Sequence, residues 1–143
     1  MYNQFAPPAI NGVDTPSPIG YSDVDFTYTF NVVMTASQAL VNQMVNLHTD
    51  ADFILRAVHY VSSGVFAVRL YDSQDFPLSD GLLYSGNLSQ DPSEPTVISP
   101  ELPFPAGSKI GVDITEMSVA GNTIQICFRG VKRYKLASVQ GQG

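Results

Sequence analysis

Residues 24–34 read VDFTYTFNVVM and alternate apolar with polar side chains more regularly than any other stretch of the chain. The even-numbered positions are all apolar, and positions 25, 27, 29 and 31 are Asp, Thr, Thr and Asn. A period of two is typical of a strand with one buried face, because successive side chains of a strand point to opposite sides. The sequence therefore predicts a half-buried strand here, and it is the clearest element in the chain.

Four further stretches are rich in β-branched and aromatic residues and lie on either side of turn signals. DFILRAVHYVS and VFAVRLYD flank Ser63-Gly64, and KIGVDIT and TIQICFRGVKRY flank Gly121-Asn122. Each pair predicts a β-hairpin, the second with a two-residue turn that tolerates positive φ. The residues expected to face the core are Phe66, Val68, Leu70, Ile110, Val112, Ile114, Ile124, Ile126 and Phe128.

Two stretches are less regular. In residues 36–47, Leu40, Met44 and Leu47 have helical spacing, but Val41 and Val45 break it, so a short helix or a strand is expected, and the surrounding strands favour the strand. Residues 72–105 hold six prolines, which predicts a long surface crossover interrupted by short strands near 82–84 and 96–98.

About eight strands separated by Gly, Pro and Asn turns, with hardly any helical periodicity, predict an all-β fold. The expected architecture is an antiparallel β-sandwich, jelly-roll-like, in one domain over residues 23–136. Residues 137–143 are expected to be a flexible C-terminal tail.

Residues 1–22 are rich in Pro, Gly and Asn, which disfavour a helix and predict an extended N-terminal arm. The arm also carries apolar residues, which are scarce in inert linkers. We expect Phe5, Ile10 and Ile19 to dock on the chain's own domain or on a neighbouring subunit.

The charge balance bears on the class of partner. Seven Lys and Arg face thirteen Asp and Glu, a net charge of −6, which argues against nucleic acid as a specific partner. No stretch approaches the ~20 apolar residues that cross a bilayer, and the proline-rich start has no basic or apolar run typical of a signal peptide or anchor. We expect no membrane partner.

Four of the seven cations fall within nine residues, at Arg129, Lys132, Arg133 and Lys135. Arg129, Arg133 and Lys135 share the face opposite Phe128 unless a bulge at Gly130 resets the phase. One interpretation is a solvated strand end that opposes aggregation. The other is an interaction surface for acidic groups on a shell or a sister subunit.

The sequence contains no motif typical of phosphate binding, zinc proteolysis or a nucleophile elbow. His48, His59 and Cys127 match no zinc spacing, and the single cysteine excludes an internal disulfide. A divalent cation could be held by His48, Asp50 and Asp52. A strand end at His48 and turn roles for the two aspartates explain this run better, and a turn role also explains Asp72 and Asp75.

We therefore expect no enzyme, no metal and no cofactor. A carboxylate pair for glycoside hydrolysis stays open, because thirteen acids are present. His59 fits a hydrogen-bonded core histidine, and Cys127 fits a small packing residue.

Residues 53–135 resemble small β-sandwich structural proteins of tailed bacteriophages. The resemblance lies in an aromatic-Pro-Ala-Gly-Ser run at residues 104–108 that enters a strand, and in Asn-Thr-Ile-Gln at 122–125 running into Phe-Arg-Gly-Val at 128–131. It implies a non-enzymatic virion protein, assembled in the host cytoplasm, that binds the capsid as a cement or decoration protein.

The same resemblance implies the major capsid protein or another virion protein as partner, and a homo-oligomer, either a dimer or a trimer. A head-tail connector or tail component is an alternative. A carbohydrate-binding sandwich is another, with Tyr71, Phe76 and Tyr84 as a stacking patch.

Overall fold

A computed structural model describes residues 20–136 and contains eight strands and one short 3-10 turn in that range. The strands are β1 (Tyr21–Met34), β2 (Ala39–Asn46), β3 (Asp52–Ser62), β4 (Phe66–Tyr71), β5 (Leu83–Tyr84), β6 (Thr96–Phe104), β7 (Lys109–Glu116) and β8 (Asn122–Lys135), and the 3-10 turn η1 spans Ser85–Asn87. Phe5, Ile10 and Ile19 of the expected arm, and the tail at 137–143, lie outside the described residues.

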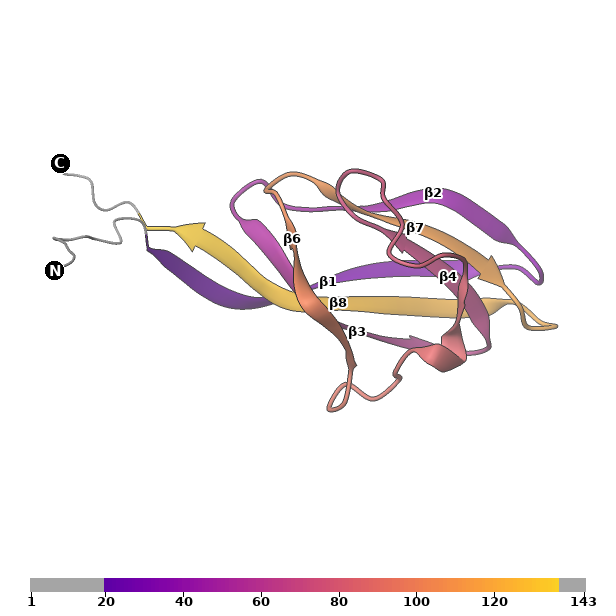
Figure 1. Cartoon of the computed structure of the whole chain (residues 1–143). Coiled ribbons are helices and arrows are strands. Elements are labelled where there is room, and N and C mark those ends of the chain that lie inside the picture. Colours follow the sequence, from indigo (N-terminus) through magenta and orange to yellow (C-terminus); the bar gives the residue numbers. More distant parts are fainter. Residues whose placement is uncertain (1–19, 137–143) are drawn as a thin grey trace, which may run out of the picture.

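The eight strands form two antiparallel four-stranded sheets, as expected from the alternation. The first sheet has the order β1-β8-β3-β6 and the second the order β2-β7-β4-β5. First pairs with last, second with seventh, third with sixth and fourth with fifth, which is one long hairpin rolled into two layers. This is the jelly roll, and the predicted fold class is confirmed (Figure 1).

The core lies between the two sheets and is built from the alternating residues that the sequence singled out. In β1 the even-numbered side chains from Phe26 to Met34 turn inward and the odd-numbered ones face outward, whereas Val24 is exposed. All nine residues expected to face the core are buried. The largest fully buried rings are Phe53, Phe66, Phe104 and Phe128.

Neither predicted hairpin exists. β3 and β4 lie in opposite sheets, and so do β7 and β8. The rings of Tyr60 and Phe66 meet edge to face beside the link between the two sheets, at 4.9 Å between centroids. The second link runs over residues 117–121, and neither Gly121 nor Asn122 has a positive φ. Both turn signals therefore mark links that pass from one sheet to the other, and we call these two links arches.

A buried amide stabilises both arches at once. Asn122 Oδ1 accepts hydrogen bonds from the backbone N–H groups of Ser63 and Gly64 at 3.1 and 3.0 Å, and its Nδ2 donates to Val65 O and to Glu116 Oε1. Asn122 thus connects the β3–β4 link to the end of β7. Gly121 is required for close packing, because a Cβ there would lie 2.7 Å from Met34 O.

The less regular stretches form strands at the expected places. Residues 39–46 form β2, an edge strand, and β5 and β6 cover the two short strands predicted in the crossover. β6 is an edge strand, where Pro100 and Pro103 are tolerated because one side of the strand needs no ladder hydrogen bonds. β1 begins at Tyr21, so it includes the last two residues assigned to the arm.

The expected bulge lies in β3 instead of β8. The ladder between β1 and β8 is continuous through Gly130, whereas the register between β3 and β8 shifts between Leu55 and Ala57. Gly130 faces this bulge, and a Cβ there would lie 1.8 Å from Ile54 O. The phase of β8 is therefore kept along its whole length.

Candidate interaction surfaces

The four clustered cations do not form one stripe. Because the phase of β8 is kept, Arg129, Arg133 and Lys135 lie on the outer face of the first sheet, as expected, while Lys132 lies on the inner face with Phe128. Arg129 and Arg133 are half-buried and Lys135 is exposed. Only three of the four are thus placed where a partner could reach them.

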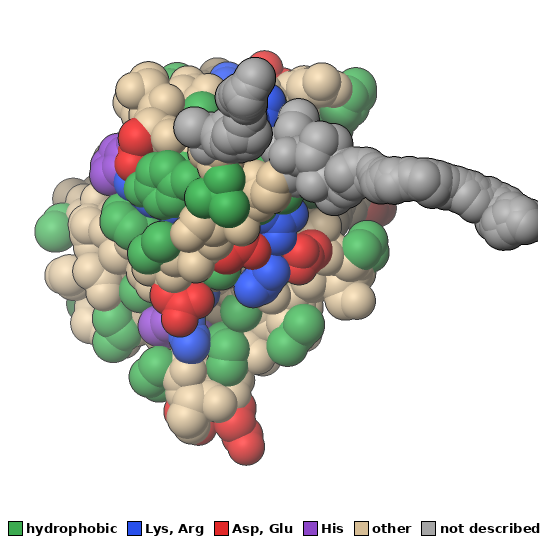
Figure 2. Space-filling model, turned by 90° about the vertical axis from the view of Figure 1, so that its left-hand side faces the viewer, with side chains coloured by type: hydrophobic (Ala, Val, Ile, Leu, Met, Phe, Trp, Pro, Cys, Tyr) green, Lys and Arg blue, Asp and Glu red, His purple; other side chains and the backbone are tan. Residues whose placement is uncertain are grey.

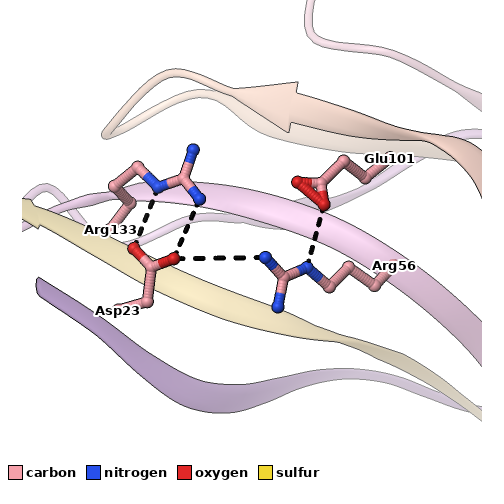
Figure 3. A network of polar contacts seen from close by, with 4 residues as sticks. All are labelled: Asp23, Arg56, Glu101 and Arg133. Atoms are coloured by element: carbon pink, nitrogen blue, oxygen red, sulfur yellow. Dashed lines mark hydrogen bonds and ion pairs between the residues drawn. The ribbon is translucent and has the colours of Figure 1, made fainter. Parts of the chain in front are cut away.

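Arg133 belongs to a row of ion pairs that crosses all four strands of the first sheet (Figure 3). Its guanidinium donates two hydrogen bonds to Asp23, at 2.9 and 2.8 Å. Arg56 lies 4.0 Å from the same carboxylate and donates to Glu101 at 3.0 Å. These bonds hold the pKa of Asp23 below its usual range. The row contains two acids and two bases, so it carries no net charge toward a partner.

Lys132 is engaged in a cluster at the edge of the core. It is 6 % exposed, its Nζ lies 2.7 Å from His48 Nδ1 and 3.1 Å from Asp50 Oδ1, and it sits 4.2 Å from the centre of the Phe26 ring. Tyr134 also donates to Asp50, and the hydrogen bonds from Tyr134 and Lys132 lower the pKa of that carboxyl group. Lys132 therefore does not serve as a surface cation.

Arg129 holds the long crossover against the first sheet. Its guanidinium donates to Pro92 O, and Ser89 O accepts from Tyr60 N beside it. His59 and Cys127 form a cross-strand pair in this region. Burial lowers the pKa of His59, with a further contribution from the charge of Arg129, and burial raises the pKa of the Cys127 thiol.

The end of the molecule that carries the start of β1 and the end of β8 shows this mixture of charges directly. In Figure 2, acidic and basic side chains touch one another there, and no continuous cationic area is visible. The β1–β8 pair also extends beyond the other strands at this end (Figure 1).

The residues considered as metal ligands have other roles. Within residues 20–136, no group of three or more His, Cys, Asp or Glu side chains is arranged to hold a metal ion. Asp50 binds Lys132 and Tyr134, and Asp52 accepts from Ala106 N. Asp72 accepts from the backbone N–H groups of Gln74 and Phe76, as a turn residue does.

An apolar surface lies along β4, in the crossover segment that the sequence marked only as a possible sugar-stacking patch. The segment runs beside β4: Leu78 N donates to Leu70 O, Pro77 bridges to Tyr71, and β5 pairs with Ala67 and Val68. Its large side chains point into solvent, with Phe76 at 62 % and Tyr84 at 61 % exposure. We call the following five exposed residues the apolar edge: Phe76, Leu78, Leu82, Leu83 and Tyr84.

The apolar edge continues into a shallow hollow of about 250 Å³ lined by Val65, Phe66, Tyr84 and Met117. A signal for it existed in the sequence, since five large apolar residues fall within nine positions of a segment otherwise rich in Pro, Ser and Asp. Exposed large apolar residues grouped in one segment beside an apolar hollow mark interaction sites more often than scattered single residues do.

The expected stacking patch is divided between two environments. Phe76 and Tyr84 belong to the apolar edge, whereas the Tyr71 hydroxyl donates to Asp113 Oδ2 at 2.6 Å, which raises the pKa of Tyr71. The Tyr71 ring packs on Gly111, where a Cβ would lie 2.9 Å from Tyr71 Cβ, and Arg69 lies 5.7 Å from its centre. Tyr71, Asp113 and Lys109 line a separate hollow of about 440 Å³ on the outer face of the second sheet.

The sequence was compared with protein-family models and with curated proteins. No protein-family model matches the chain, and no curated protein matches its sequence. Among residues 20–136 there is also no helix of the length and hydropathy that spans a membrane.

Proposed function

We propose that this chain is a non-enzymatic structural protein that binds another protein subunit through the apolar edge. Its proposed setting is the head of a tailed bacteriophage, where it acts as a cement or decoration protein that bridges capsid subunits. The apolar edge carries the proposal, because five large apolar side chains are exposed there within nine consecutive positions and adjoin an apolar hollow. The resemblance at residues 53–135 supports the setting.

The charges nearest to the apolar edge are mixed. Arg69 donates to Ser79 O and Asp80 O, and Lys109 pairs with Asp75 at 2.8 Å. The apolar side chains are therefore the feature that a partner would recognise here. We expect the attraction to change little as salt is added, because it depends mainly on apolar contact.

The fold alone does not decide between functions. Jelly rolls occur both in viral capsid proteins and in lectins. A connector or tail role remains a proposal that predicts a ring of higher symmetry, and mass measurement of the oligomer separates it from a cement protein. The carbohydrate alternative is weakened by Tyr71, which lies in a separate hollow from Phe76 and Tyr84 and whose hydroxyl is already bonded to Asp113.

A binding assay tests the proposal. The purified chain is mixed with assembled shells of the major capsid protein from the same genome, and the bound fraction is measured by cosedimentation. The double variant Phe76→Ser, Tyr84→Ser should lower the affinity at least about tenfold, since aromatic side chains often dominate binding energies. The matched control is Val97→Ser, which removes an exposed apolar residue from β6.

Two outcomes decide. If the wild-type chain does not sediment with shells, the capsid partner is wrong. If it does and the double variant binds equally well, the apolar edge is not the surface that it uses.

A further inference from the structure

Among residues 20–136, β1 is the longest edge strand, and it lacks the prolines, bulges and short length that keep the other edges from pairing with other chains; its charged residues are Asp23 and Asp25. β6 contains Pro100 and Pro103, β2 has a register shift between Leu40 and Gln43, and β5 is two residues long. β1 is 14 residues long, contains no Pro, Gly, Lys or Arg, and keeps an unbroken register with β8.

Two hydrogen bonds establish which backbone groups point away from β8. Leu136 N donates to Gly20 O, so the backbone N–H and C=O groups of even-numbered residues in β1 point toward β8. Ser63 N donates to Thr123 O, so the backbone groups of odd-numbered residues in β8 point toward β3. In an antiparallel ladder the direction alternates with each residue. The N–H and C=O groups directed to the free edge therefore belong to Tyr21, Asp23, Asp25, Thr27, Thr29, Asn31 and Val33.

We propose that this edge pairs with the β1 edge of a second copy of the chain, antiparallel about a two-fold axis near Thr27 or Tyr28. The first sheets of the two copies then join into one eight-stranded sheet, and each copy uses the same surface, as a two-fold dimer requires. Backbone hydrogen bonds supply the contact, in the manner of strand addition at an exposed edge.

The distribution of charge favours this arrangement. With the axis at Thr27, Asp23 lies opposite Asn31 and Asp25 opposite Thr29. With the axis at Tyr28, Asp23 lies opposite Val33 and Asp25 opposite Asn31. No acid then faces an acid, whereas an in-register parallel pairing would set Asp23 and Asp25 against their own copies, which is destabilising.

The N-terminal segment of the chain is a poorer occupant of the same edge. Residues 1–19 contain proline at positions 7, 8, 16 and 18, so the longest proline-free run among them is seven residues. Proline has no N–H to donate to a ladder. A second β1 offers a complete strand of matching length.

This inference rests on the proposed structural role only in that both involve assembly, and it is tested on the protein alone. The full chain is examined by analytical ultracentrifugation over a wide concentration range, and a dimer is expected. Thr29→Pro should raise the dimer dissociation constant at least about tenfold while the monomer stays folded, because the Thr29 N–H makes no bond to β8.

Met44→Pro is the matched control, since it puts a proline at an exposed position of β2, an edge strand of the second sheet, and it should leave the dimer unchanged. A second measurement does not depend on the fold tolerating proline. In a Cys127→Ala background, the double variant Thr27→Cys, Thr29→Cys should form a disulfide-linked dimer on oxidation. Val33→Cys, which faces Tyr21 or Asp23 of the partner, should not.

Several results would overturn the inference: a monomer or a trimer at all concentrations, a dimer that Thr29→Pro does not weaken more than Met44→Pro does, or no cross-link through positions 27 and 29. A monomer whose odd-numbered β1 amides resist hydrogen exchange would show that the chain itself covers the edge, which also overturns it. Each of these leaves the capsid-binding assay to be judged by its own result.

Discussion

Gly130 is a glycine because of the strand beside it and not because of its own backbone conformation. It lies in the middle of β8 with its α-carbon against the bulge of β3, where the carbonyl oxygen of Ile54 occupies the space a side chain would need. The sequence marked Gly130 as a bulge candidate. The inference was correct in kind but assigned the bulge to the wrong strand, because a glycine allows close approach from a neighbour as readily as it allows a bulge of its own.

Gly130→Ala should destabilise the protein by about 2–4 kcal/mol, since the new methyl group can be accommodated only by moving the backbone of β3. Chemical denaturation with a spectroscopic readout measures the change. Gly86→Ala is the control, because its Cβ would meet nothing within 4 Å, and it should change stability by less than about 0.5 kcal/mol. Equal effects would show that the close approach of Ile54 O does not exist in solution.

The position of Lys132 on the inner face could have been predicted from the alternation of β8. Lys132 has the same parity as Ile124, Ile126 and Phe128, so an unbroken strand places it on the inner face. Grouping it with its neighbours by charge obscured that phase. What the sequence could not supply was the set of groups that make its burial tolerable, because His48, Asp50 and Phe26 come from two distant segments.

At the scale of elements, the strands were predictable and their pairing was not. Alternation reports which residues of a strand face a core, and this is local information. A turn signal between two such strands reports that the chain reverses, but an arch between sheets reverses it just as a hairpin does. Residues 63–64 and 121–122 are both arches, and the distinction depends on Asn122, whose partners lie up to 59 residues away.

β2 was ambiguous for a reason the structure makes clear. Its register shift lies between Leu40 and Gln43, and Asn42 there has φ of 58°. The shift changes which parity faces the core: Leu40 turns inward before it, and Val45 and Leu47 after it. Apolar residues spaced across such a bulge imitate helical spacing.

The buried amide of Asn122 gives a prediction for the two arches. Asn122→Ala removes the acceptor of Gly64 N and the donor to Val65 O, and should cost about 1–2 kcal/mol because these part-buried groups lose a partner. Ser63 N and Glu116 keep other partners, Thr123 O and Ser118 N. Thermal and denaturant unfolding measure the loss. Asn31→Ala is the control, since its hydrogen bonds are exposed, and its effect should stay below about 0.5 kcal/mol.

A result in which both asparagine variants are equally stable would mean that water replaces the Asn122 amide at no cost. The two arches would then be held by the strands alone.

For the whole molecule, the fold class followed from the sequence while the surfaces did not. Eight alternating strands have few ways to bury their faces, so a sandwich was predictable. The surfaces depend on which residues of distant strands become neighbours, as in the row Asp23, Arg133, Arg56 and Glu101, which joins four strands from the two ends and the middle of the chain. The four cations that are neighbours in the sequence are separated in the fold, because Lys132 turns inward and Arg133 is paired with Asp23.

The same pairing makes the stability of the molecule sensitive to acid. Hydrogen bonds from Arg133 lower the pKa of Asp23, and those from Tyr134 and Lys132 lower the pKa of Asp50. Burial would raise the pKa of Glu116, but hydrogen bonds from Ser118, Ser37 and Asn122 outweigh it, and the pKa lies below its usual range. A carboxyl group whose pKa is lower in the folded state binds its proton more readily when the chain is unfolded. The stability it contributes is thus complete above its unfolded pKa near 4 and is lost as the pH falls toward its folded pKa.

We therefore expect the free energy of unfolding to fall steeply below about pH 4, and to fall less steeply in the double variant Asp23→Asn, Asp50→Asn, which no longer has two of the groups that take up protons on unfolding. The control is Asp80→Asn, since the Asp80 carboxylate is exposed and makes no hydrogen bond or ion pair to another described residue. Denaturant unfolding from pH 2.5 to 7 measures all three proteins. If the wild type and the double variant lose stability in parallel below pH 4, the ion pairs across the first sheet and at Lys132 do not contribute to the acid sensitivity, and the acids elsewhere in the molecule must account for it.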